Sequence, residues 1–538
     1  MRLGVILLVC VVLTILAQCG GKHTSENSLK VFRYNQASGI SSLDPAFAKD
    51  QSVIWPCFQL YSTLLQLDSN LEVKPLLAKR FEISADGLTY TFHLRDDVFF
   101  HDDSCFTGGR GRKLTAKDVA YSFQRLIIPA TASPGSWIFN DRIDKVTPFS
   151  AVSDSVFVLK LSAPFYPITG ILTMQYTGIV PREAVEKYGS DFRKHPVGTG
   201  PFRFKKWLEG SALILIKNDT YFESSTQKSV PSIDGIKITF IDNKKTEFLS
   251  FKRGELDFIT GIDAGYIDET LNEDGTLKQA LTSSMRLVKS PYLNTEYLGF
   301  CLKQKPLQKP YSDKYFRLAL NYAIDRKELI QYLRNGVGRP AEHGFAPYGL
   351  PSHDTFFSGF SLNLTKAAEY LKKSGYPNGI GLSEIILYTN ESYKDMGLLV
   401  SKQLEKIGIR TKVEIQQPAL LREWMSKGDI PFFRGSWIAD YPDAENFYTV
   451  FYSGNDAPPN YTRFHNQSFD ELYIKCLAET NPEIRKILFT KMETILVEEA
   501  PVIPLYYDEV LRFTSLRVTG LPLNGINLLD LRTVQLND

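Results

Sequence analysis

Apolar residues follow a strand-like spacing in several parts of the chain. Between residues 88 and 95 (LTYTFHLR) they occupy every second position, as in a strand with one buried face. Ile236, Ile238 and Phe240 repeat this period. Both segments are therefore predicted to be half-buried strands.

Helical spacing is found in other parts of the chain. Thr115 and Asp118 have the spacing of a capping box in front of an apolar segment, which predicts a helix start. A second helix is predicted at about 365–373, before Gly375. Another helix should begin at Asn481 and end before Pro501, with one apolar face: Ile484, Ile487, Leu488, Met492, Ile495 and Leu496. Strands and helices interleave, which favours an α/β fold.

The N-terminal residues differ from the rest of the chain. Arg2 is followed by an apolar run from Leu3 to Ala17, about 15 residues, which is shorter than the ~20 needed to span a bilayer. Residues 1–18 are therefore predicted to be a secretion signal. Residues 16–19 (LAQC) resemble the bacterial lipobox, in which Cys19 would carry the lipid anchor, although Gln18 stands where a small residue is usual. We expect an exported protein in the periplasm or on the outer face of the cytoplasmic membrane, touching the membrane through its lipid only.

Composition narrows the possible partners. The chain has 538 residues, enough for at least two packed units, and 43% of them are apolar, enough for sizeable cores. The 62 basic and 60 acidic residues nearly cancel, leaving a net charge of +2. No long-range attraction to phosphate is expected, so nucleic acid is an unfavoured partner.

Signatures of catalysis and metal binding are missing from the sequence. It has no GxSxG, HExxH or GxxxxGK[ST] motif and no complete GxGxxG. The His101-Asp102-Asp103 cluster is interpreted as a solvated loop, so no metal and no cofactor are predicted. Four separated cysteines after the signal are expected to be buried thiols without a required disulfide: Cys57, Cys105, Cys301 and Cys476.

A series of motifs, in a fixed order, resembles the solute-binding proteins for peptides and nickel in bacterial ABC importers. The similarity extends from about residue 29 to the C-terminus and is closest to the oligopeptide and dipeptide binders. The motifs are SLDP at 42–45, the segment 61–103, LTAKDVAYSFQR at 114–125, HPVGTGPF at 195–202, NTEYLGF at 294–300, FRLALNYAIDR at 316–326 and WIADYPD at 437–443.

The resemblance implies a two-lobed periplasmic-binding-protein fold of the α/β class with an extra inserted domain. Ligand would be held between lobes that close about a hinge. The implied boundaries are 29–61, 190–290 and 511–538 for a discontinuous first domain, 62–189 for the inserted second domain, and 291–510 for the other lobe.

The same resemblance implies a set of ligand-binding residues. Asp440 matches the family's acidic residue that pairs with the α-amino group of the ligand, and a buried ammonium requires such a carboxylate. Arg434 has two open interpretations: it binds the ligand's carboxylate, or it forms an internal salt bridge, for which Asp440 is one candidate partner. Trp437 is expected to line the pocket, with core packing as the alternative. Tyr507 is preferred over Tyr506 as the inward-facing ring, because strand spacing turns only one of them inward.

The predicted function is the binding component of an ABC peptide importer, a monomer that passes short peptides to a permease with separate ATPases. The backbone of residues 48–51 is expected to pair with extended peptide. A non-peptide cargo, such as a metal chelate or a glutathione-like molecule, is the nearest alternative. An exported peptidase using His101, His195 or His465 is the alternative from another class; the prediction is that the protein is not an enzyme.

Overall fold

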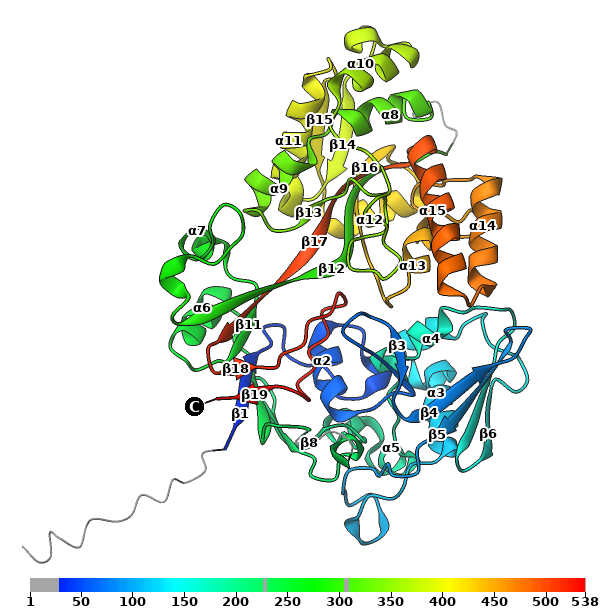
Figure 1. The fold of residues 1–538 in the computed structure, drawn as a ribbon, viewed down its shortest axis with the longest axis vertical. Coiled ribbons are helices and arrows are strands. Elements are labelled where there is room, and N and C mark those ends of the chain that lie inside the picture. The colour runs from blue at the N-terminus through cyan, green and yellow to red at the C-terminus, as the bar shows by residue number, and fades with distance from the viewer. Residues whose placement is uncertain (1–28, 226–229, 304–308, 538) are drawn as a thin grey trace, which may run out of the picture.

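The computed structural model describes residues 29–225, 230–303 and 309–537, and the predicted signal segment 1–18 and lipid anchor Cys19 lie outside them. Figure 1 shows an upper and a lower lobe joined by two long strands, β12 and β17, that run diagonally between them. The lower lobe holds the blue and cyan segments, and the upper lobe holds the yellow and orange ones. The α/β two-lobed fold predicted from the sequence is confirmed.

The main sheet extends through both lobes. Within the described residues it has eleven strands, ten of them in the order β15-β14-β16-β12-β17-β11-β1-β10-β9-β8, with β13 paired to β17. Its strands are β1 (Val31–Asn35), β8 (Phe202–Leu208), β9 (Ala212–Lys217), β10 (Gly235–Thr239), β11 (Phe258–Thr260), β12 (Met285–Phe300), β13 (Arg339–Pro340), β14 (Ile385–Thr389), β15 (Thr411–Ile415), β16 (Phe432–Ile438) and β17 (Val502–Ser515).

The strands β12 and β17 form the connection between the lobes. They pair antiparallel from Met285 opposite Ser515 to Gly299 opposite Val502, with register shifts between. The C-terminal half of β12 also pairs with β16 in the upper lobe, and the C-terminal part of β17 pairs with β11. The predicted domain boundaries at 290 and 510 fall inside these two continuous strands.

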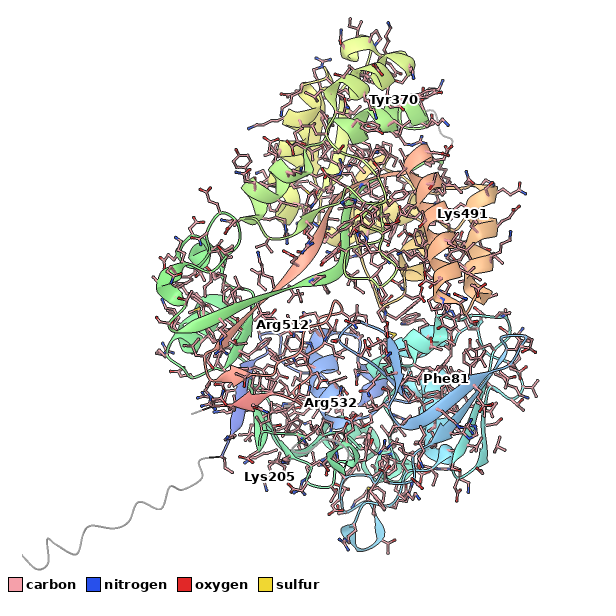
Figure 2. All side chains as sticks on the ribbon, viewed as in Figure 1. Phe81, Lys205, Tyr370, Lys491, Arg512 and Arg532 are labelled. Carbon is pink, nitrogen blue, oxygen red and sulfur yellow. The ribbon has the colours of Figure 1, made fainter. Side chains whose placement is uncertain are left out.

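Three smaller sheets belong to the lower lobe, among the residues that the structure places. A four-stranded sheet has the order β4-β5-β7-β6, and β2 pairs with β3 and β18 with β19. Figure 2 labels Phe81 on the four-stranded sheet, where its ring stacks on Phe92 at 5.7 Å. The strands are β2 (Leu65–Leu67), β3 (Val73–Pro75), β4 (Ala78–Ile83), β5 (Thr89–Leu94), β6 (Phe149–Ser153), β7 (Val156–Lys160), β18 (Val518–Thr519) and β19 (Gln535–Leu536).

Helices cover the sheets in both lobes. Figure 2 labels Tyr370 on α10 and Lys491 on α15 in the upper lobe. The helices are α2 (Gln51–Leu60), α3 (Ala116–Ile127), α4 (Ile168–Ile171), α5 (Arg182–Tyr188), α6 (Lys244–Lys252), α7 (Ile267–Thr270), α8 (Lys314–Ala323), α9 (Arg326–Arg334), α10 (Leu364–Lys373), α11 (Lys394–Glu405), α12 (Pro418–Lys427), α13 (Glu445–Tyr448), α14 (Gln467–Ala478) and α15 (Pro482–Glu499).

Several local predictions are confirmed. In β5 the side chains of Tyr90, Phe92 and Leu94 are buried and their neighbours are not, as the alternation predicts. Helix α3 begins with the predicted capping box, in which Thr115 and Asp118 satisfy each other's backbone N–H groups. The expectation of buried thiols is confirmed for Cys57, Cys301 and Cys476, whereas Cys105 is only partly buried.

The predicted apolar face of α15 is wrong in part. Ile484 and Ile487 are 44% and 55% exposed, whereas Arg485 and Glu493 are buried. Arg485 donates to Asp443 at 2.6 Å and to the Cys476 carbonyl at 2.8 Å. Tertiary partners of this kind remove the cost of burying charge, so the buried face of α15 includes polar residues that apolar spacing could not reveal.

The solvated-loop interpretation of residues 101–103 is wrong for His101. This side chain is only 5% exposed, and its Nε2 lies 3.0 Å from the Gly200 carbonyl oxygen. The Gly198 N–H donates to Nδ1 at 3.4 Å. Burial lowers the His101 pKa to about 4, so the ring is a neutral structural group that ties two loops together.

Gly198 and Gly200 lie against the end of α2. A Cβ built at Gly198 would come within 2.1 Å of the Leu60 carbonyl oxygen, and one at Gly200 within 2.4 Å of the Gln59 carbonyl oxygen. These contacts are with backbone, which cannot rotate away. The glycines of the HPVGTGPF motif therefore allow two backbone segments to approach closely.

Gly198→Ala is expected to destabilise the protein by about 1–3 kcal/mol, the typical cost of overpacking. Urea unfolding measures the change through a lower transition midpoint. Gly170→Ala is the matched control, because its added Cβ would have no neighbour closer than 3.8 Å. Equal midpoints for the two variants would contradict the close approach.

Candidate ligand-binding site

A cavity of about 250 Å³ lies between the lobes. Six parts of the chain form its wall, and two of them belong to the upper lobe and the connecting strand β12. The lining residues are Ala48, Lys49, Gln51, Ile54, Trp55, Trp137, Thr173, Met174, Gln175, Tyr176, Tyr292, Ile438, Ala439, Asp440, Pro442, Ile526, Asn527 and Leu528. The volume is close to the lower end of the ~300–1,000 Å³ typical of small-molecule sites.

Two buried side chains hold the C-terminal part of this wall in place. The Trp55 indole N–H donates to the Asn527 carbonyl at 2.8 Å. Arg512, labelled on β17 in Figure 2, donates to the Asn527 side chain and to the Leu528 carbonyl, both at 3.0 Å. The loop at 526–528 is therefore fixed relative to the connecting strand.

The cavity wall is mostly apolar and aromatic. Four of its rings come from Trp55, Trp137, Tyr176 and Tyr292. Such a wall, with a few polar groups placed on it, is typical of sites that bind small organic ligands. The charged side chains in the lining are Lys49 and Asp440.

Asp440 borders the cavity just after β16 ends at Ile438. Its backbone N–H donates to the Asn446 side chain at 3.4 Å. The carboxyl group is accessible through the cavity, yet protein surrounds it closely enough that burial raises its pKa, with Asn446 opposing in part. Among the described residues no cation contributes to this shift or pairs with Asp440. A carboxylate in this setting gains from a cationic ligand.

Arg434 is engaged elsewhere. It forms an ion pair with Glu296 on the neighbouring strand β12, and its guanidinium lies 3.3 Å from the centroid of the Tyr393 ring. It is not among the cavity-lining residues. Of the two interpretations of Arg434, the structure shows the internal salt bridge, and its partner is Glu296 instead of Asp440.

Trp437 and Tyr507 stand behind the cavity wall. The Trp437 indole N–H donates to the Asn446 carbonyl at 2.6 Å, and the ring packs against the upper-lobe core. Tyr507 is 2% exposed and its hydroxyl donates to the Gly344 carbonyl at 2.7 Å. Neither residue lines the cavity. Tyr506 faces another neighbour, Arg334, whose guanidinium lies 4.6 Å from its ring centroid.

The predicted peptide-pairing segment at 48–51 does line the cavity, but it is not a strand. It connects a 3-10 turn (Pro45–Phe47) to the start of α2. The Ala48 and Lys49 N–H groups donate to the Pro45 and Phe47 carbonyls at 3.0 and 2.8 Å. Strand addition through these two N–H groups would require the turn to open.

Most of the aromatic and amide lining was not foreseen from the sequence. Trp137, Gln175, Tyr176 and Tyr292 come from segments far apart along the chain. The high aromatic content, 12% of residues, was the one general signal. It could not single out positions, because a ring that lines a cavity and a ring in a core have the same local pattern.

Across residues 29–225, 230–303 and 309–537, no three His, Cys, Asp or Glu side chains are grouped so as to hold a metal ion. In those same ranges no helix has the length and apolar character of a membrane span.

An interlobe cavity, two connecting strands and an unpaired carboxylate on an aromatic wall define a solute-binding protein of the periplasmic type. The family model for bacterial extracellular solute-binding proteins, family 5 (middle), matches residues 72–459. The chain belongs to this family, as its motifs predicted. Members of the family are binding components of transport systems and not enzymes.

Similar proteins have different stated ligands. Heme-binding protein A of Haemophilus influenzae is 27% identical over 94% of this chain and 91% of its own length. The glutathione-binding protein GsiB of Salmonella paratyphi A is 27% identical over 90% of each chain. The periplasmic binding protein DppA of Helicobacter pylori, in complex with peptide STSA, has a TM-score of 0.72 at 25% identity and covers 96% of this chain and 100% of its own.

Proposed function

We propose that this protein captures short peptides in the interlobe cavity and delivers them to an ABC permease whose ATPases are separate chains. The observation that carries the proposal is Asp440, a carboxylate without a protein cation on a mostly apolar cavity wall. The α-ammonium of a peptide supplies the missing cation, and the rings accept side chains of many shapes. The peptide complex of a similar protein supports this ligand class.

A glutathione-like molecule is the second candidate. It combines an α-ammonium, which suits Asp440, with carboxylates that suit Lys49, the cation in the cavity lining. The similarity to a glutathione-binding protein supports this alternative. Both candidates share the amine contact and differ in the rest of the ligand.

We further propose roles for the remaining predicted residues. Arg434, Trp437 and Tyr507 support the cavity from behind, since each has its own protein partner. Cys19 carries a lipid that holds the monomeric protein near the cytoplasmic membrane after export. The three-domain division, with an inserted domain at 62–189, remains part of the proposal.

Native mass spectrometry of protein purified without denaturation tests the ligand class. We expect bound masses that correspond to short peptides, and calorimetry should show that N-acetylation abolishes binding of the same peptides. Bound heme or glutathione, with no binding of unmodified peptides, would overturn the peptide proposal. Sustained cleavage of fluorogenic peptides would contradict the binding function altogether.

A further inference from the structure

Gln175 lines the interlobe cavity and has an unsatisfied side-chain oxygen. The side chain is 4% exposed and belongs to the cavity lining. Its Oε1 is buried and has no hydrogen-bond partner in the described structure. Buried polar atoms in folded proteins are nearly always satisfied, so an exception at a cavity indicates a group that a ligand completes.

The segment that carries Gln175 is held firmly. Gln175 begins a 3-10 turn (Gln175–Thr177), and its carbonyl accepts the Gly178 N–H at 3.0 Å. The Thr177 hydroxyl donates to the Leu172 and Met174 carbonyls at 3.1 and 2.8 Å. A loose loop therefore does not explain why Gln175 Oε1 lacks a hydrogen-bond partner.

The neighbouring ring is fixed by the same kind of close packing. Tyr176 lies against Gly135, where an added Cβ would meet the ring at 2.4 Å. Tyr176 also lines the cavity, and the Asp440 charge contributes to raising its pKa, after burial as the larger cause. This turn and Asp440 therefore border the same cavity.

Two of the groups in the cavity lining offer acceptors. Asp440 contributes a carboxylate and Gln175 an amide oxygen. A primary ammonium has three N–H donors, so a carboxylate that neutralises its charge leaves donors to be satisfied by other oxygens. The Gln175 oxygen, which has no donor in the described structure, matches that requirement.

We propose that Gln175 determines specificity for primary amines: its Oε1 accepts a hydrogen bond from the same ligand ammonium that Asp440 neutralises. The inference rests on the proposed function and deepens it. It predicts discrimination between ammonium groups of equal charge that differ in their number of N–H donors.

Calorimetry with trialanine and its Nα,Nα-dimethyl derivative tests this inference, because dimethylation keeps the positive charge and leaves one N–H. Wild-type protein should bind the dimethyl peptide about 10- to 100-fold more weakly, the range expected for hydrogen bonds to a charged group. In Gln175→Met, trialanine should bind at least about tenfold more weakly than to wild type, and the penalty for dimethylation should shrink. Gln467→Met, an exposed residue on α14, is the matched control and should behave as wild type.

Two further readouts separate this role from a purely structural one. Without ligand, Gln175→Met should melt at or above the wild-type temperature, because the substitution removes an unsatisfied buried oxygen. Gln175→Glu keeps an acceptor and should retain the discrimination, which preserves the test if the Met variant folds poorly. The inference would be overturned if dimethylation weakened binding to Gln175→Met as much as it weakens binding to wild type. Asp440 variants would still lose affinity in that case, so the proposed function would stand. Failure of wild type to bind trialanine would instead count against the proposed function.

Discussion

Asp440→Asn is expected to weaken binding of an unmodified short peptide by about 3–5 kcal/mol, more than 100-fold in affinity. The substitution keeps the size of the side chain and removes its charge, so the ligand's ammonium would be buried without a counter-ion. No cation among the described residues would compensate. Isothermal calorimetry measures the change directly.

The pH dependence gives a second signature of Asp440. Burial raises the Asp440 pKa in the free protein, and a bound ammonium favours the ionised carboxylate. Wild-type affinity should therefore fall as the solution is acidified through this pKa, and Asp440→Asn should lose that dependence. Asp219→Asn, at an exposed aspartate outside the cavity, is the control. Equal affinity of the Asp440 and Asp219 variants for trialanine would refute the assignment.

Glu493→Gln is expected to stabilise the protein at neutral pH. Glu493 is buried on α15, and burial raises its pKa to about 7, although Oε1 accepts the Phe345 and Ala346 N–H groups at 2.8 and 2.9 Å. Its Oε2 has no partner in the described structure. A Cβ built at Gly344 would lie 2.6 Å from the carboxyl carbon of Glu493, so the Gly344 backbone packs closely against this group.

The sign of the effect follows from the raised pKa. The folded state binds the Glu493 proton more tightly than the unfolded state, so protonation of Glu493 stabilises the fold. That contribution is complete below the ordinary pKa of 4.5 and is lost as the pH rises through about 7. The loss is on the order of 3 kcal/mol. Gln keeps the acceptor oxygen without the charge, so Glu493→Gln should exceed wild type in unfolding free energy above pH 7 and lose the advantage near pH 4.

Urea unfolding between pH 4 and 8 measures this difference. Subtracting the wild-type curve removes the opposite contribution of His101. Because its pKa is lowered, His101 contributes stability that is complete above its ordinary pKa of 6.5 and is lost on acidification toward about 4. Glu483→Gln, at an exposed position of the same helix, is the control. A pH-independent difference between Glu493→Gln and wild type would show that folding leaves the Glu493 pKa unchanged.

Local structure was predictable where the determining interactions are local. The alternation at 88–95 fixed the buried face of β5, and Thr115 with Asp118 fixed the start of α3, because each pattern acts through neighbours in the chain. The motif at 437–443 placed Asp440 correctly after a strand, at a position that the structure brings to the cavity.

The remaining site residues depended on contacts between distant segments. Arg434 could bind a ligand or a protein carboxylate, and only the pairing of β16 with β12 supplied Glu296. Tyr507 had the expected strand spacing, but the loop carrying Gly344 covers its hydroxyl.

The sequence by itself determined the α/β fold, the family and the position of the unpaired carboxylate, because these follow from local periodicity and contiguous motifs. Tertiary structure decided which polar groups were satisfied. Arg485 found partners inside the protein and Glu493 found them for one of its two oxygens, whereas Asp440 has no cation beside it and the Gln175 oxygen has no donor in the described structure. The free energy of a buried polar group depends on partners brought together only by folding, so spacing along the chain could not assign them.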